Sequence, residues 1–172
     1  MHVITLSIAE KGDAIAVLTE TAMQKKGLSF CKNIRRTDRD YIFLPPESDA
    51  SRDVLLVHDP DVLPPCRADY VTVLNADKKT PLADTRSLIV TYGLNPLATV
   101  TASSIRSEPE HGELFCCVQR SLITLKGRVI EPQEFSVVLP PDMPEEPQTV
   151  LAFVSLGLIL SLSPKEFAHI FL

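Results

Sequence analysis

Three short apolar runs, each followed at once by turn-forming residues, constrain the fold of this chain more than any other feature of its sequence. The runs span residues 53–57, 70–74 and 87–91 and are rich in valine, leucine and isoleucine. Continuous apolar runs of this length are typical of strands that are buried on both faces of a parallel sheet. Asp, Asn, Gly and Pro gather directly after the runs, as they do in turns. The sequence therefore predicts a central, mostly parallel sheet.

The N-terminal segment predicts the strand and helix with which many α/β folds begin. Residues 2–8 alternate in polarity and are rich in β-branched side chains, which favours a strand. Asp13 is a suitable cap for a helix over residues 14–26, and Gly27 is a suitable stop for it. A further short strand is predicted over residues 41–44, because two prolines follow it.

Beyond residue 97 the pattern changes to antiparallel strands followed by helices. His111-Gly112 and Lys126-Gly127 mark two turns, and the proline-rich stretch 140–147 resembles a linker. The predicted elements are strands over residues 98–105, 114–120, 121–126 and 134–139, a helix over 148–162, and a last helix that starts at a capping box in 163–166 and runs to Leu172.

We therefore expect a single α/β domain built on an open, mostly parallel sheet with flanking helices and extended by a small antiparallel β-sheet. Its α/β part would span residues 1–97 and its antiparallel part residues 98–140. A helical hairpin over residues 148–172 would complete it.

Charge and composition exclude several classes of function. With 17 Lys and Arg against 22 Asp and Glu, the net charge is −5, so the basic footprint of a nucleic-acid-binding protein is absent. Tryptophan is absent and aromatic residues make up 6%, which disfavours a platform for stacking bases. The N-terminus lacks a signal-peptide pattern, and the longest apolar stretch, residues 150–162, is too short to span a bilayer. We expect a cytoplasmic protein with no nucleic-acid partner and no membrane partner.

The four cysteines, Cys31, Cys66, Cys116 and Cys117, contain no C-x-x-C pair. The adjacent Cys116 and Cys117 would point to opposite faces of a strand, so a shared metal or a local disulfide is disfavoured. We expect buried structural thiols and no metal site.

The order of the elements and several short motifs resemble the central ATP-binding domain of the Mur ligase family. Residues 70–77 resemble the family's strand that ends in Leu-Asn-x-Asp-Asp, and residues 89–94 resemble its Thr-Tyr/Phe-Gly segment. Similar matches follow at residues 98–105, 135–140 and 162–166, so the resemblance covers about residues 54–172. It implies the fold of that domain and a relation to enzymes that couple ATP to amide-bond formation in peptidoglycan synthesis.

The chain departs from that family at the residues that carry its chemistry. The resembled domain binds ATP phosphates with a glycine-rich loop ending in Gly-Lys-Thr/Ser, whereas residues 7–13 here contain one glycine together with Glu10 and Asp13. No lysine lies between Asn33 and Lys78, where the family has its catalytic lysine. We therefore expect a degenerate, stand-alone pseudoenzyme with no catalytic residues and no required cofactor, although residual nucleotide binding is compatible with the sequence.

The candidate binding residues lie where two predicted parallel strands end. His58, Asp59 and Asp61 follow the first strand, and Asn75 and Asp77 follow the second. Open α/β sheets place ligands at this edge, and the resemblance puts the Asn-x-Asp segment near an adenine pocket. The alternative is ordinary turn chemistry, since Asp-Pro and Asn-x-Asp are both common in turns.

The C-terminal helices carry more apolar side chains than a lone hairpin usually buries, which suggests a homo-oligomer or a protein partner at that surface. The alternative is that the sheet covers these side chains entirely.

The preferred function is a non-catalytic Mur-ligase-like module that acts by protein, nucleotide or metabolite binding. One alternative is a component of an ATP-dependent amide-forming ligase that needs a partner subunit; another discards the resemblance and leaves an α/β domain that binds a small acidic or nucleotide metabolite at residues 58–61 and 75–77. The apolar side chains of the C-terminal helices that suggest such a partner surface are those of Val150, Phe153, Leu156, Leu160, Phe167, Ile170 and Phe171.

Overall fold

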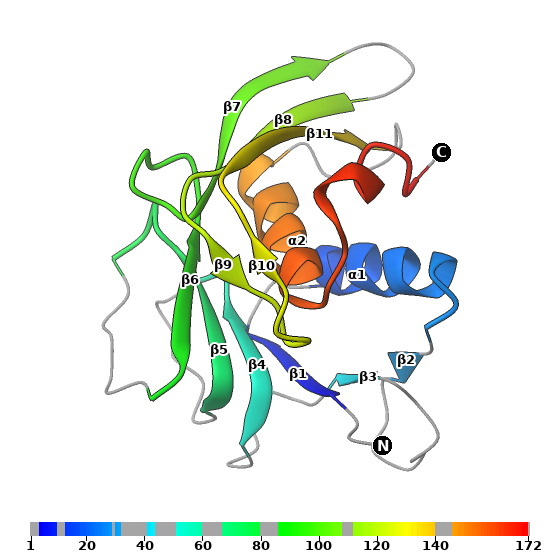
Figure 1. Cartoon of the computed structure of the whole chain (residues 1–172), viewed down its shortest axis with the longest axis vertical. Helices are drawn as coiled ribbons and strands as arrows, with labels where there is room; N and C mark the ends of the chain where they lie inside the picture. Colours follow the sequence, from blue (N-terminus) through cyan, green and yellow to red (C-terminus); the bar gives the residue numbers. More distant parts are fainter. Residues whose placement is uncertain are drawn as a thin grey trace.

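A computed structural model describes residues 4–9, 13–28, 30–31, 41–43, 51–59, 67–79, 86–107, 112–139 and 146–171. One large sheet contains β1 (Ile4–Ala9), β2 (Phe30–Cys31), β3 (Tyr41–Phe43), β4 (Arg52–Val57), β5 (Ala68–Asn75), β6 (Leu88–Tyr92), β7 (Val100–Ser107), β8 (Gly112–Val118) and β11 (Gln133–Leu139). Its strand order is β11-β8-β7-β6-β5-β4-β1-β3-β2 (Figure 1).

In the large sheet, the neighbouring strands β2, β3, β1, β4, β5 and β6 are parallel to one another. The neighbouring strands β7, β8 and β11 are antiparallel. The two parts meet where β7 pairs with β6 in parallel at Tyr92 and Val100, after which β7 continues along β8. The expected fold class, an open and mostly parallel sheet with flanking helices and an antiparallel extension, is therefore confirmed.

The ladder between β7 and β8 contains an irregularity. Its register shifts between Ala102 and Ser104, so that Ser103 lies opposite no residue of β8. Such a bulge bends the strand and strengthens its local twist. On the same two strands, the Arg106 guanidinium lies over the Phe115 ring, 5.2 Å from its centroid.

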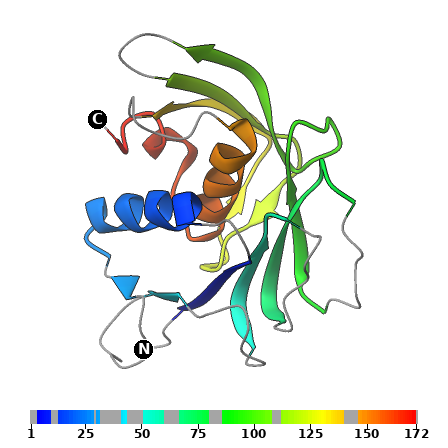
Figure 2. The same cartoon turned by 180° about the vertical axis from the view of Figure 1, so that it is seen from behind.

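Both described helices, α1 (Asp13–Lys25) and α2 (Pro147–Ile159), pack on one face of the sheet and against each other (Figures 1 and 2). α1 agrees with the predicted helix to within one residue at each end. It ends as predicted, because Gly27 adopts φ +73° while the N–H groups of Gly27 and Leu28 donate to the carbonyls of Gln24 and Met23. No helix among the described residues is long and apolar enough to cross a bilayer.

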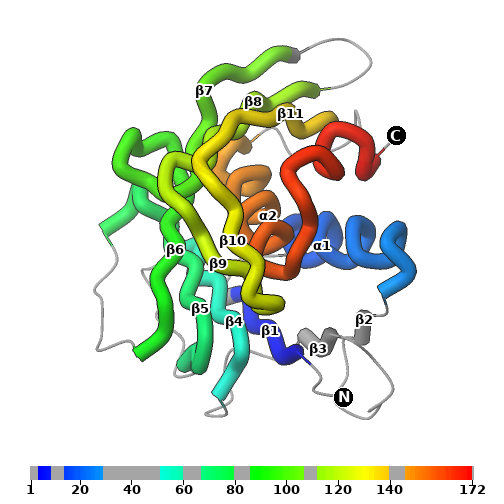
Figure 3. The backbone as a smooth tube through the Cα atoms, in the orientation of Figure 1, coloured from blue at the N-terminus to red at the C-terminus, as the bar shows by residue number. Residues whose placement is uncertain are grey.

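The apolar surface of the C-terminal segment is largely covered by the chain itself. α2 contacts α1, β5, β6 and β7, and Figure 3 shows it enclosed among these elements. The sheet and α1 therefore cover most of this apolar surface, whereas Phe171 is only partly buried, and a partner at this surface stays a prediction. Val150, Phe153, Leu156, Leu160, Phe167 and Ile170 are all at most 7% exposed.

Two of the elements predicted from the sequence are shorter in the structure than predicted. The predicted strand over residues 121–126 is only β9 (Leu122–Ile123), which pairs with β10 (Val129–Ile130) in a separate hairpin. Its turn closes early because the Thr124 N–H donates to the Arg128 carbonyl and the Arg128 N–H donates to the Thr124 hydroxyl. The Leu125 N–H donates to the Ile159 carbonyl of α2 instead of extending a ladder.

The predicted last helix is also shorter than expected. A 3₁₀-helix, η1 (Pro164–Glu166), is followed by turns up to residue 171. Phe167 and Ile170 of this tail are buried in the core.

The capping box that begins η1 is present and also attaches the C-terminal turn to α1. A Glu166 carboxylate oxygen accepts the Ser163 backbone N–H at 2.6 Å and the Ser163 hydroxyl at 2.8 Å, and Glu166 forms an ion pair with Lys26. Partial burial raises the pKa of Glu166, but the hydrogen bonds from Lys26 and Ser163 outweigh it and hold the pKa below its ordinary value. The carboxylate therefore stays charged at neutral pH.

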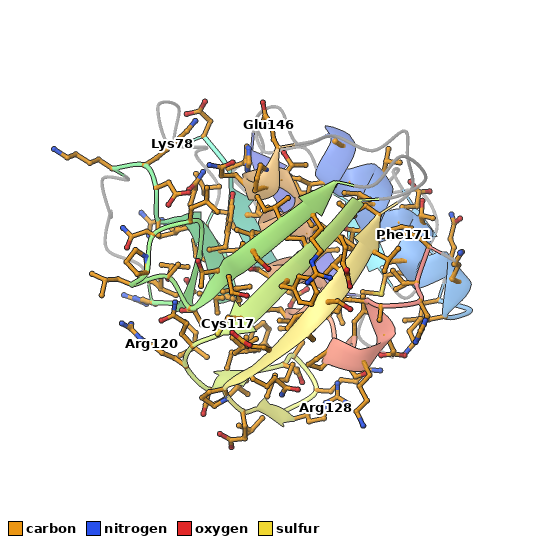
Figure 4. All side chains as sticks on the ribbon, turned by 90° about the horizontal axis from the view of Figure 1, so that it is seen from above. Lys78, Cys117, Arg120, Arg128, Glu146 and Phe171 are labelled. Carbon is orange, nitrogen blue, oxygen red and sulfur yellow. The ribbon has the colours of Figure 1, made fainter. Side chains whose placement is uncertain are left out.

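The adjacent Cys116 and Cys117 point to opposite faces of β8, as predicted. Cys116 is buried in the core, whereas Cys117 is half-buried on the outer face of the antiparallel sheet (Figure 4). Both thiols are free. Burial, followed by the neighbouring Cys117, raises the pKa of Cys116, so its thiol stays protonated at neutral pH.

Replacing Gly157 of α2 by alanine is expected to lower the free energy of unfolding by about 1–3 kcal/mol. A Cβ at this position would lie 2.8 Å from Leu162 Cδ1 and 2.9 Å from Phe167 Cζ, inside a fully packed core. Urea denaturation would measure the loss. Gly112→Ala is the matched control, because a Cβ there meets nothing within 4 Å. Equal stability of the two variants would contradict the tight packing of α2.

Candidate functional site

The carboxyl ends of β4, β5 and β6 lie side by side at one edge of the sheet. Val57 pairs with Leu74, and Leu74 pairs with Thr91, so the residues that follow the three strands are level with one another. This is the edge at which open α/β sheets bind ligands. The register thus gathers His58 and Asn75 in one place, as the sequence analysis expected for strand-end residues.

A hydrogen bond between His58 and Tyr92 joins the ends of β4 and β6. The His58 Nδ1 and the Tyr92 hydroxyl oxygen are 2.7 Å apart, and the two rings are nearly parallel, with centroids 6.1 Å apart. Because β5 lies between these strands, the pair spans the end of β5. The Asn75 side-chain amide, from β5, donates to the His58 carbonyl at 3.3 Å.

Tyr92 is held as a neutral phenol. Its side chain is fully buried, and this burial, together with the negative charges of Asp77 and Asp59, raises its pKa. The phenol therefore keeps its proton well beyond the ordinary range, which suits a structural hydrogen bond more than proton transfer near neutral pH.

Asp77 fastens the loop that follows β6. One carboxylate oxygen accepts the Leu94 N–H at 2.8 Å and the other accepts the Asn95 N–H at 2.7 Å, while Gln148 at the start of α2 donates at 3.5 Å. The loop approaches the carboxylate so closely that a Cβ at Gly93 would lie 2.7 Å from an Asp77 oxygen. Gly93 also has φ +148°, a conformation that other residues rarely adopt.

The remaining polar contacts connect the β4 and β5 turns. The Lys78 ammonium forms an ion pair with Asp59 at 3.0 Å, with side chains 43% and 15% exposed, respectively. The Asn75 side-chain oxygen accepts the Asp77 N–H at 3.0 Å. In the described part of the chain, no group of three or more His, Cys, Asp and Glu side chains is arranged to hold a metal ion.

The structure therefore brings the candidates His58, Asp59, Asn75 and Asp77 into one cluster, whereas Asp61 lies outside the described residues. Their role in ligand binding stays a prediction.

Three members of the cluster were not predicted as site residues from the sequence: Tyr92, Gly93 and Lys78. Tyr92 and Gly93 follow an apolar run just as Asn75 does, so their place at a strand end was a usable signal. Lys78 resembles solvated surface in the sequence, and its partner Asp59 is distant along the chain, so no local pattern connects the two.

No protein-family model and no curated protein matches this sequence. Similar folds occur among solved structures. MurF from Acinetobacter baumannii matches 98% of this chain with a TM-score of 0.59 and 13% identity, over 46% of its own length. MurF from Thermotoga maritima in complex with ADP matches 97% with a TM-score of 0.63 and 9% identity, over 48% of its length.

MurC from Thermotoga maritima matches 95% of this chain with a TM-score of 0.53 and 11% identity, over 44% of its length. The chain thus spans less than half the length of these solved structures. At such low identities the comparison concerns the fold and does not extend to activity. The chain has a Mur-ligase-like α/β fold.

Proposed function

We propose that this chain is a non-catalytic binding module on a Mur-ligase-like fold, with its binding site at the carboxyl ends of β4, β5 and β6. The observation that carries the proposal is the connection between β1 and α1. β1 ends at Ala9 and α1 begins at Asp13, so only residues 10–12 join them. Ala9, the last residue of β1, pairs with Val57, so β1 ends level with β4 at the edge of the candidate site.

A phosphate-binding loop needs more chain and different residues than this connection offers. It cradles phosphate with backbone N–H groups of a glycine-rich segment, adds a lysine charge, and holds Mg²⁺ with a hydroxyl at the start of the helix. The sequence here is Glu-Lys-Gly, and the first helical residue is Asp13. A carboxylate at that position repels phosphate. The residues present therefore do not fit the ATP phosphates.

The cluster at the strand ends favours binding over covalent chemistry. Asp77 accepts two backbone N–H groups, so both of its carboxylate oxygens are already engaged in holding the loop that follows β6. The phenol of Tyr92 is buried and neutral. A ligand at this edge would therefore meet hydrogen-bonding groups and an ion pair, and we assign its binding to His58, Asp59, Asn75 and Asp77.

Calorimetric titration with Mg-ATP tests the proposal. We expect no saturable heat up to about 1 mM nucleotide, which corresponds to less than about 4 kcal/mol of binding free energy. MurF from Thermotoga maritima, which was solved with ADP, is the positive control. Saturable binding in the micromolar range would contradict the proposal and favour the alternative, a component of an ATP-dependent amide-forming ligase that needs a partner subunit.

A parallel titration with adenosine separates base recognition from phosphate recognition. Binding of adenosine without a gain from the phosphates would support a nucleoside site at the strand ends. In that case His58→Ala is expected to abolish the heat, whereas Lys165→Ala, an exposed change on η1, is expected to leave it unchanged. Unchanged binding in His58→Ala would place the nucleoside elsewhere.

A further inference from the structure

A group of large apolar side chains is exposed at the end of the sheet opposite the candidate site. Tyr70 is 56% exposed and Leu88, the first residue of β6, is 59% exposed. Ile123 and Val129, which pair with each other in the β9–β10 hairpin, are 51% and 50% exposed. Figure 1 shows this hairpin beside β5 and β6. We call these four residues the hairpin patch.

Three residues of the hairpin patch line a cavity of about 320 Å³. The cavity is lined by Tyr70, Leu88 and Ile123 and also by two charged residues, Asp69 and Arg86. Within the described part of the chain, no hydrogen bond or ion pair engages the Asp69 carboxylate or the Arg86 guanidinium. One negatively charged and one positively charged side chain therefore line the same cavity without forming an ion pair with each other.

A patch that holds both charges is complementary to a rotated copy of itself. In a two-fold symmetric interface, residue i of one chain faces residue j of the other, and j faces i. Exposed clusters of large apolar residues mark interaction surfaces, because covering them removes apolar area from water. We propose that two copies of this chain associate through the hairpin patch, with Arg86 of each copy facing Asp69 of the partner subunit.

A second copy of this chain would cover more of the hairpin patch than a small ligand would. A small molecule in the cavity would leave Val129 in water, since Val129 is half-exposed and does not line the cavity. A second copy covers the rim, fills the cavity with apolar side chains and neutralises both charges. The C-terminal segment offers no comparable surface among the described residues, because its large apolar side chains are buried except for the partly buried Phe171.

The inference goes beyond the proposed function and fails separately from it. Binding at the carboxyl ends involves the residues after Val57, Leu74 and Thr91, whereas the interface involves the amino ends of β5 and β6. A monomeric chain would overturn this inference but leave the proposed absence of ATP binding untouched. A dimeric chain that binds ATP would overturn the proposed function but leave this inference untouched.

Sedimentation velocity over about 1–100 μM protein gives the first test. We expect the wild-type chain to approach twice the monomer mass as the concentration rises. Leu88→Asp is expected to remain monomeric. Leu97→Asp is the matched control, because Leu97 is 70% exposed on a loop outside the hairpin patch, and this variant is expected to associate like the wild type. A monomeric wild type, or a dimer that Leu88→Asp does not weaken, would overturn the proposal.

Charge exchange gives the second test. Asp69→Arg and Arg86→Asp each place like charges opposite each other in a symmetric dimer, so each variant alone is expected to self-associate about tenfold more weakly or worse. An equimolar mixture is expected to form a heterodimer, because both contacts then join opposite charges. Native mass spectrometry would identify the species. If each single variant dimerises normally, or if the mixture fails to associate while both variants remain folded by circular dichroism, the pairing is wrong.

Discussion

Gly93→Ala is expected to lower the free energy of unfolding by about 3 kcal/mol or more, which is a large fraction of the stability of a typical domain. Two separate effects add. The backbone at Gly93 has φ +148°, where a side chain introduces strain, and the new Cβ would lie 2.7 Å from an Asp77 oxygen. Because Asp77 also holds the N–H groups of Leu94 and Asn95, relief of the clash breaks those bonds. Urea denaturation monitored by circular dichroism would measure the change.

A double-mutant cycle separates the two effects. In the Asp77→Ala background the clash is absent, so Gly93→Ala is expected to retain only the backbone strain of about 1–3 kcal/mol. Gly112→Ala, where a Cβ meets nothing within 4 Å, controls for the general effect of the substitution. A Gly93→Ala penalty that is the same in both backgrounds would show that the carboxylate does not hold the loop as described.

Tyr92→Phe is expected to lower stability by about 1–3 kcal/mol at pH 7 and to change its dependence on alkaline pH. The loss at pH 7 follows from removing the buried hydroxyl that bonds His58. The pH dependence follows from burial, which, with Asp77 and Asp59, raises the pKa of Tyr92 in the folded chain. Below about pH 10 the phenol is neutral in both states, so pH has no effect through this group.

Above about pH 10 the unfolded chain loses the phenol proton while the folded chain keeps it, so the stability contributed by Tyr92 is lost as the pH rises. Well above pH 10, the free energy of unfolding of the wild type falls by about 1.4 kcal/mol per pH unit through this group. The phenyl ring of the variant has no proton to lose, so this fall is absent in Tyr92→Phe. The stability gap between wild type and Tyr92→Phe should therefore narrow by about 1 kcal/mol between pH 10 and pH 11, because the phenol of the unfolded chain is only half deprotonated at pH 10. It should be constant between pH 7 and pH 9. Urea curves at these pH values would test both statements, and parallel pH profiles would contradict them.

The sequence predicted the parallel sheet well because its evidence is local. The runs that became β4, β5 and β6 are mostly apolar, and this pattern favours strands of a parallel sheet whatever the strand order, although the first two residues of β6 are exposed. Gly27 ended α1 for an equally local reason, since a left-handed residue is needed there. The C-terminal tail was predicted poorly, because the burial of Phe167 against distant aromatic side chains decided its path and not the capping box.

The candidate site was predicted in its parts but not as a whole. His58 and Asn75 were identified from their place at strand ends. The contact between His58 and Tyr92 was not, because it depends on β5 lying between β4 and β6, and strand order cannot be read from a local pattern. Asp77 was considered as a ligand contact, and its bonds to Leu94 and Asn95 show a loop-fastening role that needs the fold to be visible.

The bulge at Ser103 has a consequence for the behaviour of this protein at high concentration. β7 pairs with β6 at one position, so beyond Val100 no described strand lies along its other side. A straight strand with such an open edge would offer unpaired backbone groups to other chains and promote fibrous aggregation. The bulge bends this edge, and the charged Arg106 lies near its end over Phe115. The irregular strand thus protects a half-open sheet from fibre growth by making strand addition unfavourable.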